Sequence, residues 1–133
     1  SIECIVVGGV YRSRSNSFVG GLAIRTLQQV YGGKSFIGVD GLSLDAGLTT
    51  PHHQEAEVAR EMISRTSGEV IVLADSSKIG GIAPFLTAPL EAVDIVVTDS
   101  GLDDEYRAAL EERGIRLVIA TVPESVAEPG DDA

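Results

Sequence analysis

The sequence predicts an α/β fold, a three-layer α/β/α domain with a mainly parallel sheet. Five short apolar runs alternate with amphipathic segments along the 133 residues. The runs lack the polar–apolar alternation of half-exposed strands, so both faces of their sheet should be covered. Strand–helix–strand order with right-handed crossovers then places helices on the two sides of the sheet.

The predicted strands are short and rich in β-branched residues, as strands usually are. They are "IECIVV" (2–7), "SFIGV" (35–39), "VIVLA" (70–74), "DIVVT" (94–98) and "IRLVIA" (115–120). The first run contains Cys4, the only cysteine of the chain. We predict that Cys4 is a small core residue in a reducing compartment, which for this protein means a cytoplasmic location.

Three helices are predicted between the strands. The first runs from about Gly20 to Tyr31 and stops at a glycine pair. The second has Thr50 as its N-cap and a proline at its first helical position. The third begins in "LDDEY" (102–106) and ends at Gly114.

The predicted organisation is one domain over residues 1–121 followed by an acidic tail over residues 122–133. The tail, "VPESVAEPGDDA", should be disordered because it is acidic, contains proline and has little to bury. The chain starts at Ser1, one residue before a predicted strand, so we expect the domain to be incomplete at its N-terminus.

Charge and hydropathy exclude two classes of partner for this chain. Its net charge of −10 argues against binding nucleic acid through phosphates, which requires a basic face. No apolar run approaches the ~20 residues that a membrane-spanning helix needs. We therefore expect neither nucleic acid nor a membrane to be bound by these residues.

Three predicted strands end in aspartate, at Asp40, Asp75 and Asp99. Ligands of open parallel sheets bind at the carboxyl ends of the strands. Carboxylates gathered there can orient the hydroxyls of a small polar ligand. Capping of the following turn is the favoured interpretation for Asp99. For Asp40 and Asp75 we favour ligand binding.

The "DSS" turn after the third predicted strand leads to Lys78, one of two lysines in the chain. Ser76 and Ser77 offer hydroxyl donors, and the amides of the turn can form an anion-binding nest. A lysine is a compact charge suited to a phosphate. The alternative is a surface lysine paired with Asp75.

Two weaker patterns contain residues able to bind ions. His53 and Glu57 are four residues apart on the second predicted helix, but no third ligand follows at helical spacing, so we predict no metal. The segment "GGVYRSRSNSFVGG" (8–21) contains Arg12, Arg14 and several hydroxyls. It either wraps an anion or is a mobile loop, and the sequence does not decide between them.

Taken in order, several of these segments resemble the C-terminal effector-sensing domain of DeoR-family bacterial repressors of sugar operons. The resemblance covers Ile2 to about Ala120 and depends on the order of its motifs, "GVDG", "GLT", "EAEV" and "ADSSK". It implies a fold similar to ribose-5-phosphate isomerase and the CoA transferases. It also implies an allosteric site for a phosphorylated sugar or related metabolite at the strand ends.

In the isomerases, a similar Asp-Gly turn and a similar Asp-x-Ser-Lys turn line the sugar-phosphate pocket. Carried over to this sequence, the resemblance gives a predicted ligand-binding set of Asp40, Gly41, Glu55, Asp75, Ser76 and Lys78. No cofactor or catalytic residue is implied. The alternative is a phosphosugar isomerase with Glu55 or Glu57 as its base, disfavoured because "DGLSL" lacks the isomerases' second carboxylate pair.

The resemblance further implies parts of the protein that precede this sequence. DeoR-family regulators begin with a winged helix-turn-helix that contacts operator DNA, and the sensing domain begins with a Gly-Thr-Thr-type phosphate loop. Neither segment is present here, so DNA binding is expected only of the intact regulator, as a homo-oligomer. A purely structural oligomerisation domain is the third alternative, but it does not explain the polar strand ends.

Overall fold

The structure, a computed structural model, describes residues 1–121. In chain order the elements are β1 (Val10–Arg12), β2 (Ser17–Val19), α1 (Gly21–Leu27), β3 (Gly32–Gly38), β4 (Gly41–Ser43), β5 (Gly47–Thr50), α2 (His53–Ser64), β6 (Thr66–Leu73), the 3₁₀ turn η1 (Ser76–Lys78), β7 (Phe85–Ala88), the 3₁₀ turn η2 (Leu90–Ala92), β8 (Ile95–Asp99), α3 (Asp104–Glu112) and β9 (Arg116–Ala120).

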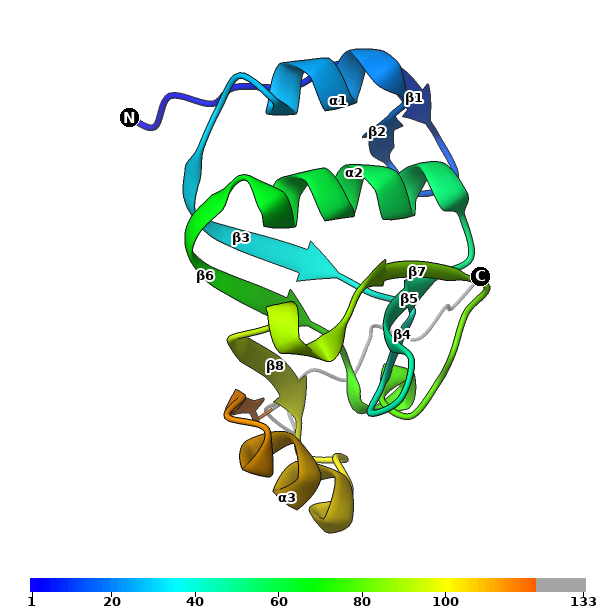
Figure 1. The fold of residues 1–133 in the computed structure, drawn as a ribbon, viewed down its shortest axis with the longest axis vertical. Coiled ribbons are helices and arrows are strands. Elements are labelled where there is room, and N and C mark those ends of the chain that lie inside the picture. Colours follow the sequence, from blue (N-terminus) through cyan, green and yellow to red (C-terminus); the bar gives the residue numbers. More distant parts are fainter. Residues whose placement is uncertain (122–133) are drawn as a thin grey trace, which may run out of the picture.

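A parallel sheet with the strand order β3-β6-β8-β9 forms the centre of the fold (Figure 1). Its register places Ile37 beside Val72 and Ile95 beside Ile71. The four strands correspond to the predicted runs at 35–39, 70–74, 94–98 and 115–120. The α/β class and the parallel sheet are therefore confirmed.

A second sheet, antiparallel with the order β4-β5-β7, packs against the first. The main hydrophobic core lies between them: Val72 and Val96 of the parallel sheet join Leu42 and Leu48 of the antiparallel sheet, and α3 adds Leu110. All five side chains are fully buried. The sequence did not predict this sheet, because its strands are three or four residues long and contain glycine and threonine.

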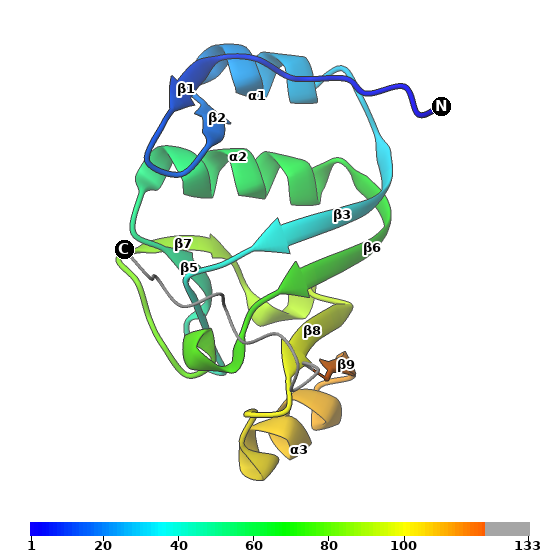
Figure 2. The ribbon, with the colours of Figure 1, turned by 180° about the vertical axis from the view of Figure 1, so that it is seen from behind.

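The helices pack at opposite ends of the molecule. In both views α2 lies between α1 and the parallel sheet, whereas α3 lies beside β8 and β9 (Figures 1 and 2). The third predicted helix is confirmed at both ends, since Asp103 accepts a hydrogen bond from the amide of Glu105 at 2.7 Å and Gly114 has a φ of +80°. The first helix ends at Leu27, four residues earlier than predicted.

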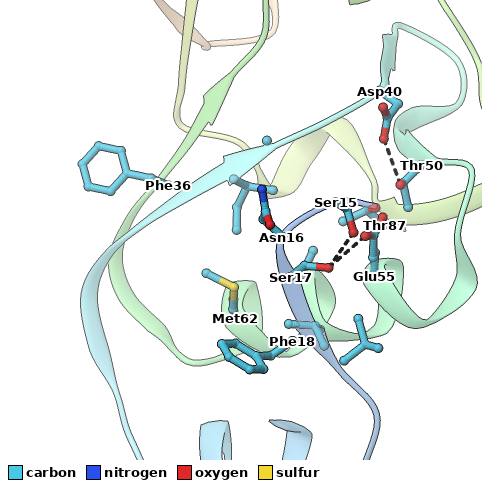
Figure 3. A pocket seen from close by; sticks show the side chains of 15 residues that line it. Ser15, Asn16, Ser17, Phe18, Phe36, Asp40, Thr50, Glu55, Met62 and Thr87 are labelled. Carbon is cyan, nitrogen blue, oxygen red and sulfur yellow. Dashed lines mark hydrogen bonds between the residues drawn. The ribbon is translucent and has the colours of Figure 1, made fainter. Parts of the chain in front are cut away.

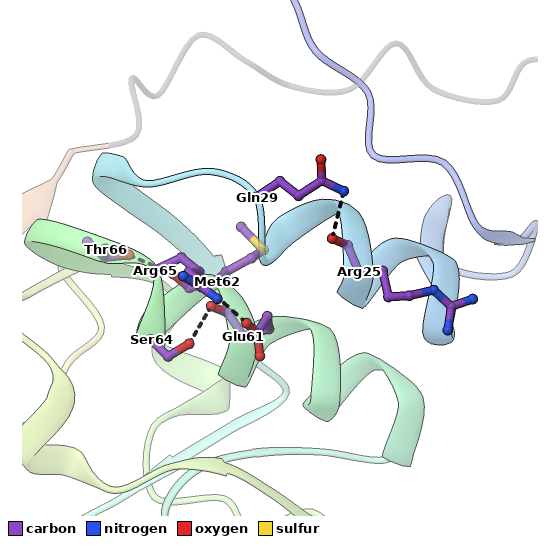
Figure 4. Close-up of polar contacts among 7 residues, drawn as sticks. All are labelled: Arg25, Gln29, Glu61, Met62, Ser64, Arg65 and Thr66. Atoms are coloured by element: carbon purple, nitrogen blue, oxygen red, sulfur yellow. Dashed lines mark hydrogen bonds and ion pairs between the residues drawn. The ribbon is translucent and has the colours of Figure 1, made fainter.

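Polar contacts organise the end of α2 and its connection to β6 (Figure 4). The Arg65 guanidinium pairs with Glu61 across one helical turn, with 3.2 Å between Nε and Oε1, and it also lies over the ring of Tyr31. The hydroxyl of Thr66 donates to the carbonyl of Met62 at 2.8 Å. These contacts set the position from which β6 enters the sheet.

The prediction of a strand at 2–7 is wrong. Residues 1–9 form no strand or helix, and the segment runs along α1, away from the parallel sheet (Figure 2). Ile2 is 96% exposed and Cys4 is exposed as well, so the prediction of a core cysteine is also wrong. An apolar run becomes a strand only where a neighbour pairs with its amides and carbonyls, and no described strand does so here.

The predicted start of the second helix is also wrong. Thr50 is the last residue of β5, paired with Phe85 of β7, and α2 begins at His53 with His52 as its N-cap. The Thr50 hydroxyl donates to a carboxylate instead of capping the helix. Pairing between strands therefore overrides the local capping signal.

Two further predictions concern the C-terminal tail and membrane-spanning segments. The predicted disordered tail, 122–133, lies outside the described residues. Within residues 1–121, no helix combines the length and the apolar character required to span a membrane.

Replacing Leu110 by alanine should lower the free energy of unfolding by about 2–5 kcal/mol, because it opens a cavity in the core between the two sheets. The matched control is Leu22→Ala on α1, where the side chain is 62% exposed and the change should stay within about 0.5 kcal/mol. Urea denaturation of both variants measures the difference. Equal losses would contradict this location of the core.

Candidate functional site

A cavity of about 550 Å³ lies beside the carboxyl end of β3 (Figure 3). It is open to solvent on one side and bounded by the β1–β2 hairpin, by β3, by the end of β5, by α2 and by β7. Its lining residues are Ser15, Asn16, Ser17, Phe18, Val19, Phe36, Ile37, Gly38, Asp40, Thr50, Glu55, Val58, Ala59, Met62 and Thr87.

Asp40 lies where the chain passes from the parallel sheet to the antiparallel sheet, after β3 and directly before β4. Its Oδ2 accepts a hydrogen bond from the Thr50 hydroxyl at 3.0 Å, and its amide donates to the carbonyl of Thr49 at 3.2 Å. These bonds hold the carboxylate at the cavity wall. Because a carboxylate accepts through both oxygens, Oδ1 can still accept a bond from a ligand.

Glu55 faces the cavity from the first turn of α2. Its Oε1 accepts a hydrogen bond from the Ser17 hydroxyl at 2.9 Å and lies 3.5 Å from Nη1 of Arg12. Partial burial raises the pKa of Glu55, but hydrogen bonds from the hydroxyls of Ser15 and Ser17 and electrostatic interactions with Arg12 and His52 outweigh that effect. The pKa of Glu55 is thus held below its usual value, and the side chain is a carboxylate at neutral pH.

Hydroxyl and amide groups fill much of the remaining polar wall. Ser15 and Ser17 are hydrogen-bonded to each other at 2.8 Å, and Thr87 is almost fully buried. Asn16 occupies the left-handed region at a φ of 48°, in the turn that joins β1 to β2, and its side chain accepts a bond from the Tyr11 hydroxyl. Apolar side chains of β2, β3 and α2 supply the apolar part of the wall. Hydroxyls, carboxylates and apolar patches together suit a small polyhydroxylated molecule.

The Asp75–Lys78 turn follows β6 and forms η1. Asp75 caps it, accepting a hydrogen bond from the amide of Ser77 at 2.9 Å, and Gly80 donates to the carbonyl of Leu42 in β4 at 2.7 Å. Lys78 is half-buried, and within residues 1–121 no ion pair joins it to Asp75. The turn therefore packs beside the antiparallel sheet, and the pairing of Lys78 with Asp75 does not occur.

Asp99 joins the ends of two neighbouring strands. Its Oδ2 accepts from the amide of Ser76 at 2.9 Å, and its Oδ1 accepts from the amide of Gly101 at 2.8 Å. The backbone bond from Ser76, with further bonds from the Ser76 hydroxyl and the Gly101 amide, lowers the pKa of Asp99. This geometry confirms the interpretation of Asp99 as a capping residue.

The predicted ligand-binding residues are divided by the structure. Asp40 and Glu55 line the same cavity, whereas Gly41, Asp75, Ser76 and Lys78 are not among its lining residues. Gly41 is buried in β4, where a Cβ would lie 2.6 Å from the carbonyl oxygen of Gly81. For Gly41, Asp75, Ser76 and Lys78, a role in ligand binding stays a prediction.

Sequence reasoning missed the hairpin as a wall of the cavity. From the sequence, the segment 8–21 is either an anion-binding loop or a mobile loop; in the structure it contains β1 and β2 and contributes Ser15, Asn16 and Ser17 to the cavity wall. Its density of hydroxyls was the available signal. Thr50 was assigned to a helix cap, although the "GLT" motif pointed to this region.

No group of three potential metal ligands occurs in the part of the chain that the structure describes. His53 lies against the rings of His52 and Phe85, with centroid distances of 5.1 and 5.7 Å. Its surroundings are therefore aromatic.

Comparison with known proteins gives a consistent result. Residues 1–100 match the family model described as the DeoR C terminal sensor domain. The HTH-type transcriptional regulator GlpR of Haloferax volcanii is 32% identical over 116 residues, which are 87% of this chain and 45% of that protein. The HTH-type transcriptional regulator IolR of Bacillus subtilis is 33% identical over 120 residues, 90% of this chain and 47% of that protein.

A third relative, the HTH-type transcriptional repressor GlcR of Bacillus subtilis, is 30% identical over 118 residues, 89% of this chain and 45% of that protein. The chain thus spans a little less than half the length of these relatives, all of which are named as transcriptional regulators and not as enzymes. By the family model and by these relatives, the chain belongs to the DeoR C-terminal sensor domain family of transcriptional regulators.

Proposed function

We propose that this chain senses a phosphorylated sugar or related metabolite for a DeoR-family regulator of sugar metabolism. One observation carries the proposal: a cavity at a strand end, in a sensor domain, contains two carboxylates surrounded by hydroxyls. Its volume of about 550 Å³ is typical of cavities that take small metabolites. Asp40 and Glu55 accept bonds from the sugar hydroxyls.

The effector acts through a population shift. A ligand that prefers one arrangement of the regulator changes operator affinity by its difference in affinity for the two arrangements. Operator DNA is contacted by a helix-turn-helix part of the intact regulator, the type of DNA-binding unit that the names of the relatives give. The intact regulator acts as a homo-oligomer in the cytoplasm. The cavity connects the hairpin, both sheets and α2, so an occupant that contacts them all can favour one arrangement of them.

The alternative of a phosphosugar isomerase is disfavoured by the state of Glu55 as well as by the family. A general base for neutral pH has its pKa raised toward 7. Glu55 has its pKa lowered, and its Oε1 is already bonded to Ser17. Such a carboxylate accepts hydrogen bonds well but removes a carbon-bound proton poorly.

The experiment that tests the proposal is a thermal-shift screen of the natural protein that contains residues 1–133. The probes are ribose-5-phosphate, glucose-6-phosphate, other pentose and hexose monophosphates, their parent sugars and inorganic phosphate. Calorimetry then measures the affinity of the best probe. Stabilisation by at least one sugar phosphate supports the proposal, and no stabilisation by any of them rejects it.

Replacing Asp40 by asparagine should make the binding free energy of the best sugar phosphate less favourable by about 1.5–3 kcal/mol, because a charged acceptor is lost from the cavity wall. Asp45→Asn is the matched control, since Asp45 is exposed in the turn between β4 and β5 and does not line the cavity. Calorimetry on both variants makes the comparison. Unchanged affinity in Asp40→Asn would remove Asp40 from the site.

Lys78→Ala tests the predicted role of the η1 turn. If the ammonium group neutralises the ligand phosphate, affinity should fall by about 1.5–3 kcal/mol. Lys34→Ala, at the only other lysine, is the control, since Lys34 lies in β3 beside Glu69. A loss no larger than that of the control, measured by calorimetry, would exclude Lys78 from the phosphate site.

Residues 1–133 alone should not bind operator DNA. Their net charge of −10 repels the DNA polyanion and opposes the counterion release that drives DNA binding. A mobility-shift assay at physiological salt compares this chain with the natural protein, using the promoter regions beside its gene. A specific complex formed by residues 1–133 would contradict the assignment of DNA binding to another part.

A further inference from the structure

We propose that Arg12, on the β1–β2 hairpin, binds the phosphate group of the effector at the edge of the cavity. This inference rests on the proposed function, and it adds a residue that neither the resemblance nor the strand-end pattern assigned.

The cavity by itself is unsuited to an anion. Its lining contains Asp40 and Glu55 and no lysine, arginine or histidine. A phosphate monoester carries a charge of about −1.5 to −2 at pH 7, and two carboxylates beside it repel it strongly where the dielectric is low. Because Glu55 stays ionised at neutral pH, protonation does not relieve the repulsion. A phosphorylated ligand therefore needs a cation from just behind the wall.

Arg12 is in that position. It is the last residue of β1, and the turn and strand that follow it contribute Ser15, Asn16 and Ser17 to the cavity. Its Nη1 lies 3.5 Å from Oε1 of Glu55. Among residues 1–121, no other lysine or arginine forms an ion pair with a carboxylate of the cavity.

The guanidinium of Arg12 has hydrogen-bonding capacity to spare. A charge-assisted hydrogen bond measures about 2.7–2.9 Å, so the 3.5 Å contact with Glu55 is an ion pair without a short bond. Ser17 donates to that same oxygen. Within the described residues Nη1 is buried and has no hydrogen-bond partner, so it keeps the capacity to donate to an acceptor brought by a ligand. Phosphate oxygens fit the two-pronged guanidinium well.

The side chain of Arg12 is partly open to solvent. It is about a quarter exposed (23%), as is that of Glu55 (22%), so neither lies in the buried core. Glu55 lines the cavity and Arg12 lies directly behind it, and we call the position of this pair the rim of the cavity. A phosphate at this rim contacts Arg12 while the sugar ring occupies the polar interior between Glu55 and Asp40. The proposal thus separates the two ends of the ligand: carboxylates for the hydroxyls and the guanidinium for the phosphate.

The test is calorimetry on the natural protein and its variants, with the best sugar phosphate of the screen, the parent sugar and inorganic phosphate. Arg12→Ala should lower the affinity for the sugar phosphate by about 10- to 100-fold and the affinity for the parent sugar by less than about twofold. Arg12→Lys, which keeps the charge but cannot donate two parallel hydrogen bonds from a planar group, should give an intermediate loss of affinity for the sugar phosphate. The matched control is Arg14→Ala, because Arg14 is exposed in the same hairpin turn. The affinity of this variant for the sugar phosphate should not change.

The outcomes separate the inference from the proposed function. A wild-type protein that binds no sugar phosphate rejects both. Binding by the wild type with unchanged affinity in Arg12→Ala leaves the proposed function standing and overturns the inference. Equal weakening of sugar phosphate and parent sugar also overturns it, since that is the effect of a structural role. If Arg12→Ala does not fold, Arg12→Gln keeps a hydrogen-bonding stem without the charge and is subject to the same criteria.

Discussion

The burial of one apolar layer between the parallel and antiparallel sheets is the constraint on which the rest of the molecule depends. Val72 and Val96 meet Leu42 and Leu48 there, and Leu110 closes the layer from α3. Because β4 must leave the end of β3 at once to bury Leu42, the chain turns sharply at Asp40 and Gly41. Gly41 is required at this turn, since a Cβ would meet the backbone of Gly81. The carboxylate of Asp40 is thereby fixed at the strand end.

The cavity follows from the same path of the chain. After β4 and β5, Thr50 returns the chain to the carboxyl end of β3, and α2 begins three residues later. Its first turn brings Glu55 to the same side as Asp40, so residues 40–55 deliver both carboxylates to one place. The β1–β2 hairpin then encloses the space through the hydrogen bond and ion pair that it forms with Glu55. The carboxylate of Glu55 thus provides the polar link between the hairpin and α2, which also pack against each other through β2.

The sequence predicted those elements whose local signals agree with their packing. The runs at 70–74 and 94–98 are largely buried in their strands, whereas the run at 115–120 forms the edge strand β9, whose residues are exposed or half-buried. The helix α3 carries both of its end signals. The run at 2–7 has the composition of a strand but no partner among the described residues, and composition alone cannot supply one. The strands of the antiparallel sheet are too short for any periodicity to appear. In the site, the strand-end rule found Asp40 and the resemblance added Glu55, whereas the hairpin serines depend on a turn with no strong pattern.

The charges around Glu55 connect the fold to the choice of ligand. Hydroxyl donors and the Arg12 guanidinium keep this carboxylate ionised, so the cavity stays acidic across the physiological pH range. An acidic cavity that is rich in hydroxyls favours ligands that donate hydrogen bonds, and it penalises every anion that brings no compensating contact. On the proposal made for Arg12, this side chain offsets that penalty at the rim beside Glu55. No cation is among the residues that line the cavity near Asp40, so a phosphate placed there meets a carboxylate unless Lys78 of the η1 turn reaches it. The position of the phosphate, more than the identity of the sugar ring, would then determine which metabolite is sensed.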